Sequence, residues 1–266
     1  MKERKKEAVV ILCGGRGTRL QEETEFKPKA LVEIGGRPIL WHLLRIYHHH
    51  GYYRFILCLG YKGNMIKEYF LNYAAMSNDF TLRLRSGAQQ IWSHTDNIED
   101  WEITFVDTGL DTQTGGRLYR IRHLIHEPFF LANYCDGLGD VDLDALVEFH
   151  TRHGKLATVT GFHPRSRFGI VRIDETGIVN YWQEKPIMSD LTSGGYFVFN
   201  RGVFDHLDAD CILEQAPLQN LAKDQQLALF PHHGAWHCMD TYKEAVTLNE
   251  MWVRGKAPWK VWGDDA

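Results

Sequence analysis

The sequence predicts an α/β fold in which a mixed, mostly parallel sheet is flanked by helices and carries a small antiparallel element. Three observations predict it. Short apolar runs alternate with segments of helical periodicity along the chain, the first run is apolar throughout and ends in glycines, and a hairpin pattern interrupts the alternation after residue 165. No repeat or low-complexity tract divides the 266 residues, so we expect a single domain over 1–266 with an antiparallel portion at about 165–200.

The first half of the chain begins this alternation. Ala8 to Cys13 is a short apolar run, which is typical of a strand buried on both faces of a parallel sheet. A helix is expected to begin at Pro38 and to end before Gly51, because proline favours the first helical position and glycine follows the last. Phe55 to Leu59 is predicted as the second strand, and Asn64 to Tyr73 as another helix.

In the second half the pattern continues and then changes. Ile103 to Val106 is predicted as a strand that enters a glycine-rich segment, Asp107 to Arg117. Phe129 to Tyr134 has the composition of a buried strand, and Asp142 to His153 has helical spacing with a glycine after it.

A hairpin and a last helix follow. Phe168 to Asp174 and Ile178 to Gln183 flank a Thr-Gly turn and predict a hairpin, with a further antiparallel strand at Gly195 to Asn200. The last helix is expected at Thr241 to Val253, and the tryptophans after it are expected to pack against the body or a sister subunit.

Composition excludes several classes of protein. With 44% apolar and 24% charged residues the chain is globular rather than disordered, and a net charge of −4 lacks the basic surplus of nucleic-acid-binding surfaces. The five cysteines are odd in number and never spaced C-x-x-C, which fits neither a disulfide framework nor a thiolate zinc site and predicts the cytoplasm. No apolar stretch approaches the ~18 residues of a membrane span, and the charged residues 1–7 are expected to be a solvated leader.

The segment Gly14 to Leu20, directly after the first strand, is a candidate phosphate-binding loop. Glycines let backbone N–H groups approach an anion, although a tight turn would use them too. The spacing G-G-x-G matches neither the ATPase P-loop nor the dinucleotide fingerprint, which argues against a nicotinamide-dependent oxidoreductase. Arg19 and Lys29 add two cations, which favours a polyphosphate ligand.

Two acids follow apolar runs in the same way. Asp136 comes at the carboxyl end of a buried strand, where ligands bind in open α/β sheets. Asp240 stands between an apolar stretch and the last helix, so it is either a ligand or that helix's N-cap. If the two carboxylates converge, they form an oxygen site suited to Mg²⁺, whose remaining ligands would be phosphate oxygens and water.

Other segments add weaker signals. Glu184-Lys185-Pro186 supplies a third cation after a strand, and Ser193-Gly194-Gly195 a second close approach of the backbone. The three histidines at 48–50 lie at a helix end, where consecutive residues cannot face one metal together. Neither a Gly-x-Ser-x-Gly elbow nor an H-E-x-x-H motif occurs, so acyl transfer and zinc hydrolysis have no support.

Taken together, the motifs resemble the nucleoside-triphosphate sugar nucleotidyltransferases over nearly the whole chain. The glycine segment with Pro28-Lys29, the acid at 136 and the E-K-P at 184–186 are general to that superfamily. The segments that point to its cytidylyl branch are Lys27-Pro28-Lys29, Val32 to Gly36 with Ile39 to His42, Gly60 to Gly63, Val106 to Gly109, Thr114 to Arg117, Met239 to Thr241 and Gly255 to Lys260.

The resemblance implies a Rossmann-like nucleotidyltransferase fold and a role for each matching residue. The nucleotide would contact Leu12, Cys13, Gly14, Gly15, Arg16, Gly17, Thr18, Arg19, Lys29, Thr112 and Arg117. The sugar phosphate would contact Cys135, Glu184, Lys185, Ser193 and Gly194. Mg²⁺ would bind Asp136 and Asp240, and the residues expected to act on the reacting phosphates are Arg19, Lys29 and Lys185.

The resemblance also implies a reaction. It is the Mg²⁺-dependent transfer of a cytidylyl group from CTP to glucose 1-phosphate, giving CDP-glucose and pyrophosphate for polysaccharide biosynthesis, in a homo-oligomer that is a trimer or a hexamer. Two residues near the expected sugar site depart from the family pattern: Cys135 replaces a usual glycine and Ser193 a usual asparagine. The alternatives are transfer to another sugar 1-phosphate or from dTTP or UTP, and a non-catalytic subunit that binds nucleotide sugars.

Overall fold

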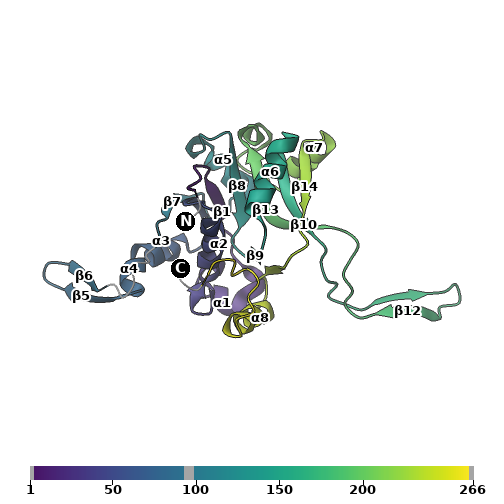
Figure 1. Ribbon diagram of the computed structural model, residues 1–266, viewed down its shortest axis with the longest axis horizontal. Coiled ribbons are helices and arrows are strands. Elements are labelled where there is room, and N and C mark those ends of the chain that lie inside the picture. Colours follow the sequence, from purple (N-terminus) through teal and green to yellow (C-terminus); the bar gives the residue numbers. More distant parts are fainter. Residues whose placement is uncertain (1–2, 93–98, 264–266) are drawn as a thin grey trace.

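A computed structural model describes residues 3–92 and 99–263, and a seven-stranded sheet forms its centre (Figure 1). The strand β13 runs antiparallel to both of its neighbours, and the other pairings in this sheet are parallel. The predicted mixed, mostly parallel sheet is therefore confirmed. In spatial order its strands are β14 (Leu227–Pro231), β10 (Ala157–Phe162), β13 (Thr192–Asn200), β8 (Phe129–Tyr134), β1 (Val9–Leu12), β4 (Arg54–Leu59) and β7 (Glu102–Asp107).

The central strand β1 explains why the first apolar run has no polar face. Val9 and Ile11 belong to one hydrophobic cluster, whereas Val10 and Leu12 belong to another on the opposite face of the sheet. Alternate side chains of a strand point to opposite faces, so a strand covered on both sides must be apolar throughout. The first cluster includes residues of α2 (Ile39–His49), α6 (Leu143–His153) and α8 (Tyr242–Val253), and the second includes residues of α5 (Thr114–Arg120) and α7 (Ala216–Lys223).

Each helix predicted from the sequence is found in the structure, although one of them is divided in two. The helix expected between Pro38 and Gly51 is α2, and the segment expected to be one helix from Asn64 to Tyr73 is divided between α3 and α4. The last helix has Thr241 as its N-cap. The helices are α1 (Gln21–Thr24), α2 (Ile39–His49), α3 (Gly63–Leu71), α4 (Tyr73–Met76), α5 (Thr114–Arg120), α6 (Leu143–His153), α7 (Ala216–Lys223) and α8 (Tyr242–Val253).

Within the described residues, four two-stranded sheets accompany the central one. The predicted hairpin forms as β11 and β12, which make a separate sheet. The further antiparallel strand predicted at Gly195 to Asn200 is part of β13 and joins the central sheet. A second hairpin, β5 and β6, was not predicted. The small sheets are β2 (Glu33–Ile34) with β3 (Arg37–Pro38), β5 (Asp79–Arg83) with β6 (Ala88–Trp92), β9 (Gly137–Gly139) with β15 (Trp236–Cys238), and β11 (Ile170–Ile173) with β12 (Val179–Gln183).

Residues 163–191, here called the arm, project from the body and end in the hairpin of β11 and β12 (Figure 1). The two segments that connect this hairpin to the body, residues 163–169 and 184–191, are called the stalk. Backbone hydrogen bonds cross this stalk, from Ser166 N to Pro186 O (2.8 Å) and from Met188 N to Pro164 O (2.9 Å). The β5–β6 hairpin projects from the other end of the molecule (Figure 1). The two hairpins thus give the protein an elongated outline.

The two ends of the described chain lie against the body. Lys5 donates its backbone N–H to Gly51 O (3.0 Å) and forms a β-bridge with Tyr52. Part of the charged leader, which was expected to be solvated, is therefore packed against the body. Trp259 and Trp262 are buried in the first cluster beside α2, which agrees with packing against the body. Among the described residues no helix is long and apolar enough to cross a membrane.

Candidate active site

The short antiparallel pair β9–β15 brings Asp136 and Asp240 together. Asp136 directly precedes β9, and Cys238 at the end of β15 is paired with Gly137. Met239 then donates its N–H to the backbone oxygen of Asp136 at 3.0 Å. As a result, a carboxylate oxygen of each aspartate and the Cys238 thiol all lie within 4.8 Å of one another. The alternative role of Asp240 as an N-cap is wrong, because Thr241 caps α8.

Two cations hold this pair of acids. Lys29 Nζ lies between the carboxylates, donating to Asp136 Oδ2 at 2.6 Å and to Asp240 Oδ1, while Arg19 donates to Asp240 Oδ2 at 3.2 Å. Burial raises the pKa of Asp240, but Lys29 and then Arg19 outweigh it and bring the pKa below its ordinary value. Burial likewise opposes the charge of Lys29, yet Asp136 and Asp240 raise its pKa overall. Both partners are therefore charged at neutral pH.

A cleft of about 270 Å³ opens beside these acids and contains much of the predicted nucleotide site. The glycine segment forms one wall, where Gly17 has φ +63° and a Cβ would lie 2.8 Å from the Thr24 side chain. Predicted residues that line the cleft are Leu12, Gly14, Gly15, Gly17, Lys29, Thr112, Arg117, Cys135 and Asp136. Arg16 and Thr18 instead line a neighbouring hollow of about 310 Å³.

Arg117 is buried and holds the loops of the cleft in place. Its guanidinium donates to Leu59 O (2.9 Å), Gly109 O (2.8 Å) and Gly14 O (3.1 Å), among other acceptors. A Cβ on Gly14 would come within 2.1 Å of this guanidinium, which explains why that position is glycine. Because the terminal N–H groups already have protein acceptors, the structure gives Arg117 a loop-positioning role, and its contact with nucleotide stays a prediction.

Polar residues that were not predicted as ligand contacts complete the cleft. Gln113, Thr114 and Tyr134 line it, and Tyr134 donates its hydroxyl to Glu214, which also accepts a hydrogen bond from Thr114 Oγ1 at 2.7 Å. Gln113 and Thr114 lie in the glycine-rich segment Asp107 to Arg117, at the start of α5. Polar residues at the start of a helix within that segment were the signal that could have identified them as ligand contacts. In the neighbouring hollow, Arg16 forms an ion pair with Asp111 at 2.9 Å.

The predicted sugar-site residues are divided between two places. Gly194 is buried and its carbonyl accepts a hydrogen bond from Trp236 Nε1 (2.8 Å), which places Ser193 and Gly194 next to the strand that leads to Asp240. Cys135 is buried against the thiol of Cys13, whose pKa is raised by burial and by that contact.

Glu184 and Lys185 lie on the stalk of the arm and do not line the cleft. Lys185 Nζ is 3.6 Å from Glu184 Oε1, and the Lys185 carbonyl accepts a hydrogen bond from Arg165 at 3.2 Å. Lys185 has φ +44°, in the left-handed region that favours glycine. Residues in such strained conformations cluster at ligand-binding sites. The expected role of Lys185 stays a prediction.

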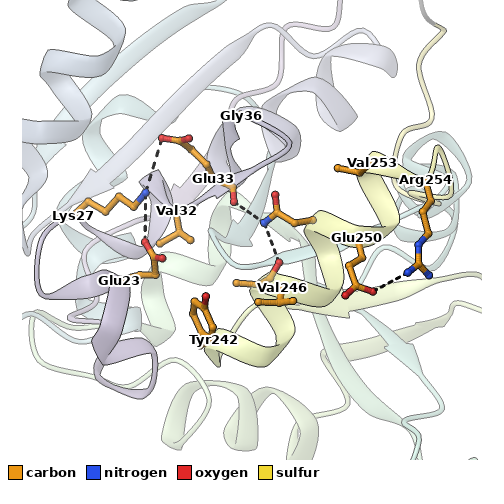
Figure 2. A pocket seen from close by; sticks show the side chains of 12 residues that line it. Glu23, Lys27, Val32, Glu33, Gly36, Tyr242, Val246, Glu250, Val253 and Arg254 are labelled. Carbon is orange, nitrogen blue, oxygen red and sulfur yellow. Dashed lines mark hydrogen bonds and ion pairs between the residues drawn. The ribbon is translucent and has the colours of Figure 1, made fainter.

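A larger hollow, of about 670 Å³, lies between α8 and residues 23–36 and contains none of the predicted site residues (Figure 2). Lys27 lies there between Glu23 (3.5 Å) and Glu33 (3.9 Å). Asn249 of α8 accepts from Gly35 N at 2.8 Å and donates to Glu33 O at 3.0 Å. These contacts tie the helix that follows Asp240 to the segment that carries Lys29.

Comparison with known proteins gives the family. A family profile described as "Nucleotidyl transferase" matches residues 8–236. The chain is 46% identical to a glucose-1-phosphate cytidylyltransferase of Salmonella typhi, covering 95% of this chain and 98% of that protein. It is 44% identical to a protein of Bacillus subtilis (strain 168) named probable glucose-1-phosphate cytidylyltransferase, covering 95% and 99%.

Solved structures agree on the fold. The crystal structure of HddC from Yersinia pseudotuberculosis matches with a TM-score of 0.67 at 21% identity, covering 92% of this chain and 99% of that one. A UDP-glucose pyrophosphorylase complexed with UDP-glucose matches with a TM-score of 0.67 at 15% identity, covering 94% and 99%. With the family profile spanning most of the chain and the cytidylyltransferases matching nearly all of it, the chain belongs to the nucleotidyl transferase family.

Proposed function

We propose that this chain transfers the cytidylyl group of CTP to glucose 1-phosphate, forming CDP-glucose and releasing pyrophosphate. The observation that carries the proposal is the convergence of Asp136, Asp240, Lys29 and Arg19 beside a glycine-lined cleft. Two acids can hold a divalent cation, and two cations beside a glycine-rich backbone can bind phosphate oxygens. These groups together would position two phosphorylated substrates and offset their negative charge. The two cytidylyltransferase relatives supply the choice of CTP and glucose 1-phosphate.

The reaction needs no general base. A phosphate monoester has a second pKa near 6, so the sugar phosphate is mostly dianionic at pH 7 and its oxygen can attack the α-phosphorus of CTP directly. The bond from the α-phosphorus to the bridging oxygen of pyrophosphate breaks as the new phosphorus–oxygen bond forms. The obstacle is the repulsion between two polyanions, which the protein must offset with placed positive charge.

The chain's own cations meet that requirement. Arg19 is largely exposed at the mouth of the site, and Lys29 is mostly buried but lines the cleft, so both would be within reach of a bound triphosphate. Lys185 would approach the attacking phosphate from the arm. Backbone N–H groups of the glycine segment would hold the remaining phosphate oxygens.

The two aspartates fit a divalent cation. Their carboxylates face each other across a positively charged group, and Mg²⁺ binds through one or two carboxylates together with phosphates. When bound, Mg²⁺ would neutralise charge that develops on the phosphate oxygens. Asp136 and Asp240 would hold it, and Lys29 would then be free to bind the substrate.

A matrix of substrates tests the proposal. Pyrophosphate release is measured with CTP, UTP and dTTP, each against glucose 1-phosphate and other sugar 1-phosphates. We expect the CTP and glucose 1-phosphate pair to give the highest kcat/KM. A higher value with another sugar would assign the departures at Cys135 and Ser193 to sugar choice, and binding without release in every pair would show a non-catalytic subunit.

We also infer that the active form is a homo-oligomer that acts in the cytoplasm. Both hairpins expose large apolar side chains, including Trp92 on β6 and Trp182 on β12, and an isolated hairpin is only marginally stable in water. Covering these side chains with a second copy would stabilise both hairpins. Sedimentation at several protein concentrations distinguishes the expected trimer or hexamer from a monomer.

A further inference from the structure

Glu244 connects the metal-binding turn to the arm. Its Oε2 accepts hydrogen bonds from the backbone N–H groups of Asp240 (2.8 Å) and Thr241 (2.9 Å), while Thr241 Oγ1 accepts from Glu244 N at 3.3 Å. Its other oxygen, Oε1, lies 3.6 Å from the guanidinium of Arg167, which belongs to the stalk of the arm. One carboxylate therefore contacts both the turn that carries Asp240 and the arm.

Arg167 lies next to the stalk contacts that support Lys185. Its neighbour Ser166 donates to Pro186 O at 2.8 Å, and Arg165 donates to the carbonyl of Lys185 at 3.2 Å. Holding Arg167 against α8 therefore also restrains the position of Lys185 relative to α8, because these stalk contacts connect the two residues' segments. Among the hydrogen bonds and ion pairs of the described residues, the Arg167–Glu244 pair is the one that joins the arm to α8.

We propose that Glu244 is a positioning residue that keeps Lys185 in register with the Asp136 and Asp240 pair. The proposal rests on the proposed function, in which Lys185 binds the attacking sugar phosphate and the aspartates bind the divalent cation. One half of Glu244 sets the backbone of Asp240, and the other half sets the base of the arm through Arg167. A shift of the arm would then change the distance between the two substrates' phosphates.

Two substitutions separate these halves. In Glu244→Gln the amide oxygen can still accept from both backbone N–H groups, but the negative charge facing Arg167 is lost. Arg167→Ala removes the same contact from the arm side and leaves the capping turn unchanged. Matched controls are Glu250→Gln, on the same helix and paired with Arg254 at 3.4 Å, and Arg172→Ala, on the arm itself.

Two readouts are needed. Hydrogen exchange of the stalk amides, measured without substrate, reports whether the arm is tied to α8. The KM for glucose 1-phosphate, compared with kcat and the KM for CTP, reports whether the tie serves the sugar phosphate. We expect both substitutions to speed exchange at Ser166 and Met188 and to raise the KM for glucose 1-phosphate roughly two- to five-fold, the size of an exposed ion pair. The controls should change neither.

The double variant Arg167→Ala with Glu244→Gln should be no worse than either single variant, because all three lack the same contact. Additive effects, unchanged exchange, or faster exchange with an unchanged KM would each overturn the proposal. If the wild-type protein forms no CDP-glucose at all, the proposed function fails while the exchange data still show whether the tie exists. The two failures are thus distinguishable.

Discussion

At Arg19, an exposed side chain contacts a half-buried acid, and its loss should harm catalysis rather than folding. The Arg19 side chain is 79% exposed and its visible partner is Asp240. Removing one positioned charge from such a site costs about 10² to 10³ in rate, by analogy with an oxyanion donor. We therefore expect Arg19→Ala to lower kcat by that factor and to leave the urea unfolding free energy within about 0.5 kcal/mol.

Arg254→Ala provides the control for this measurement, because Arg254 is also an exposed arginine with a carboxylate partner, on the far end of α8. It should leave kcat unchanged. A turnover of Arg19→Ala close to that of the wild type at saturating substrate would remove Arg19 from the mechanism.

Lys29 separates two carboxylates, so its removal should make the protein more dependent on a divalent cation. In Lys29→Gln the aspartates face each other without the ammonium, and a bound cation no longer has to displace it. Ligand binding to the native state raises its stability. We expect added Mg²⁺ to raise the Tm of Lys29→Gln more than that of the wild type.

Lys27→Gln serves for comparison, since Lys27 also lies between two carboxylates but away from the cleft. Its Tm should respond to Mg²⁺ as the wild type does. Equal Mg²⁺ shifts in all three proteins would argue that Lys29 and the cation do not share a site.

Which residues face the substrate could be predicted only in part. Glycines followed by Arg19 and Lys29 predict an anion site, because a glycine turn lets backbone N–H groups approach an anion and the two cations add positive charge beside it. The buried position of Arg117 could not be predicted, since its acceptors are backbone carbonyls contributed by three separate segments. A backbone carbonyl leaves no mark on the sequence.

At the scale of elements, Asp240 directly precedes the N-cap of α8, Thr241. Because the cap and the acid are different residues, helix capping can be tested separately from metal binding. Thr241 and Glu244 form a capping box, in which each side chain accepts a hydrogen bond from the other's backbone N–H. Loss of a threonine N-cap costs about 1 kcal/mol. We expect Thr241→Ala to lower the unfolding free energy by about that amount, measured by urea denaturation.

Thr247→Ala is the matched change within α8, because the Thr247 hydroxyl only donates to Lys243 O on the exposed side. It should alter stability by less than about 0.5 kcal/mol. Equal losses in the two variants would mean that the cap contributes nothing particular.

The elements that could be predicted are those whose burial marks the sequence. The helix at Ile39–His49 repeats apolar residues at helical spacing, and the strand at Val9–Leu12 is apolar throughout because both of its faces are covered. The β9–β15 pair has three residues a side and joins segments about a hundred residues apart, so neither length nor pattern announces it. The β5–β6 hairpin is exposed along both strands. Polar and apolar residues alternate along β5, a signal that was overlooked, whereas β6 has no such alternation.

At the scale of the whole molecule, a buried histidine should make the fold sensitive to acid. His42 is fully buried among Trp252, Trp259 and Trp262, and burial, helped by the charge of Arg37, lowers its pKa to about 4 from an ordinary 6.5. Between those values the unfolded chain binds a proton that the native state does not, so stability rises with pH and falls on acidification.

From pH 7.5 to pH 5 the expected contribution of His42 to the loss of unfolding free energy is about 2 kcal/mol, from 1.36 kcal/mol for each pH unit between 6.5 and 5. Urea unfolding at the two pH values measures it. In His42→Gln, whose amide can still donate to Ile34 O, this part of the pH dependence should disappear. The same dependence in wild type and variant would show that other groups cause the acid sensitivity.

The overall architecture follows from the sequence more fully than the site does. Alternating strands and helices leave few topologies for a buried parallel sheet. The sequence does not indicate that the hairpin of the arm projects from the body instead of joining that sheet. Lys185 illustrates the difference: its motif is legible in the sequence, but its place on a projecting stalk is not.

The most direct test of the account is pyrophosphate release from CTP and glucose 1-phosphate in Mg²⁺, comparing the wild type with Asp240→Asn. The account predicts steady release by the wild type and a rate at least about 100-fold lower for the variant, with unchanged circular dichroism, because the amide cannot hold the cation as the carboxylate does. Release by Asp240→Asn at the wild-type rate, or none by the wild type, would contradict it.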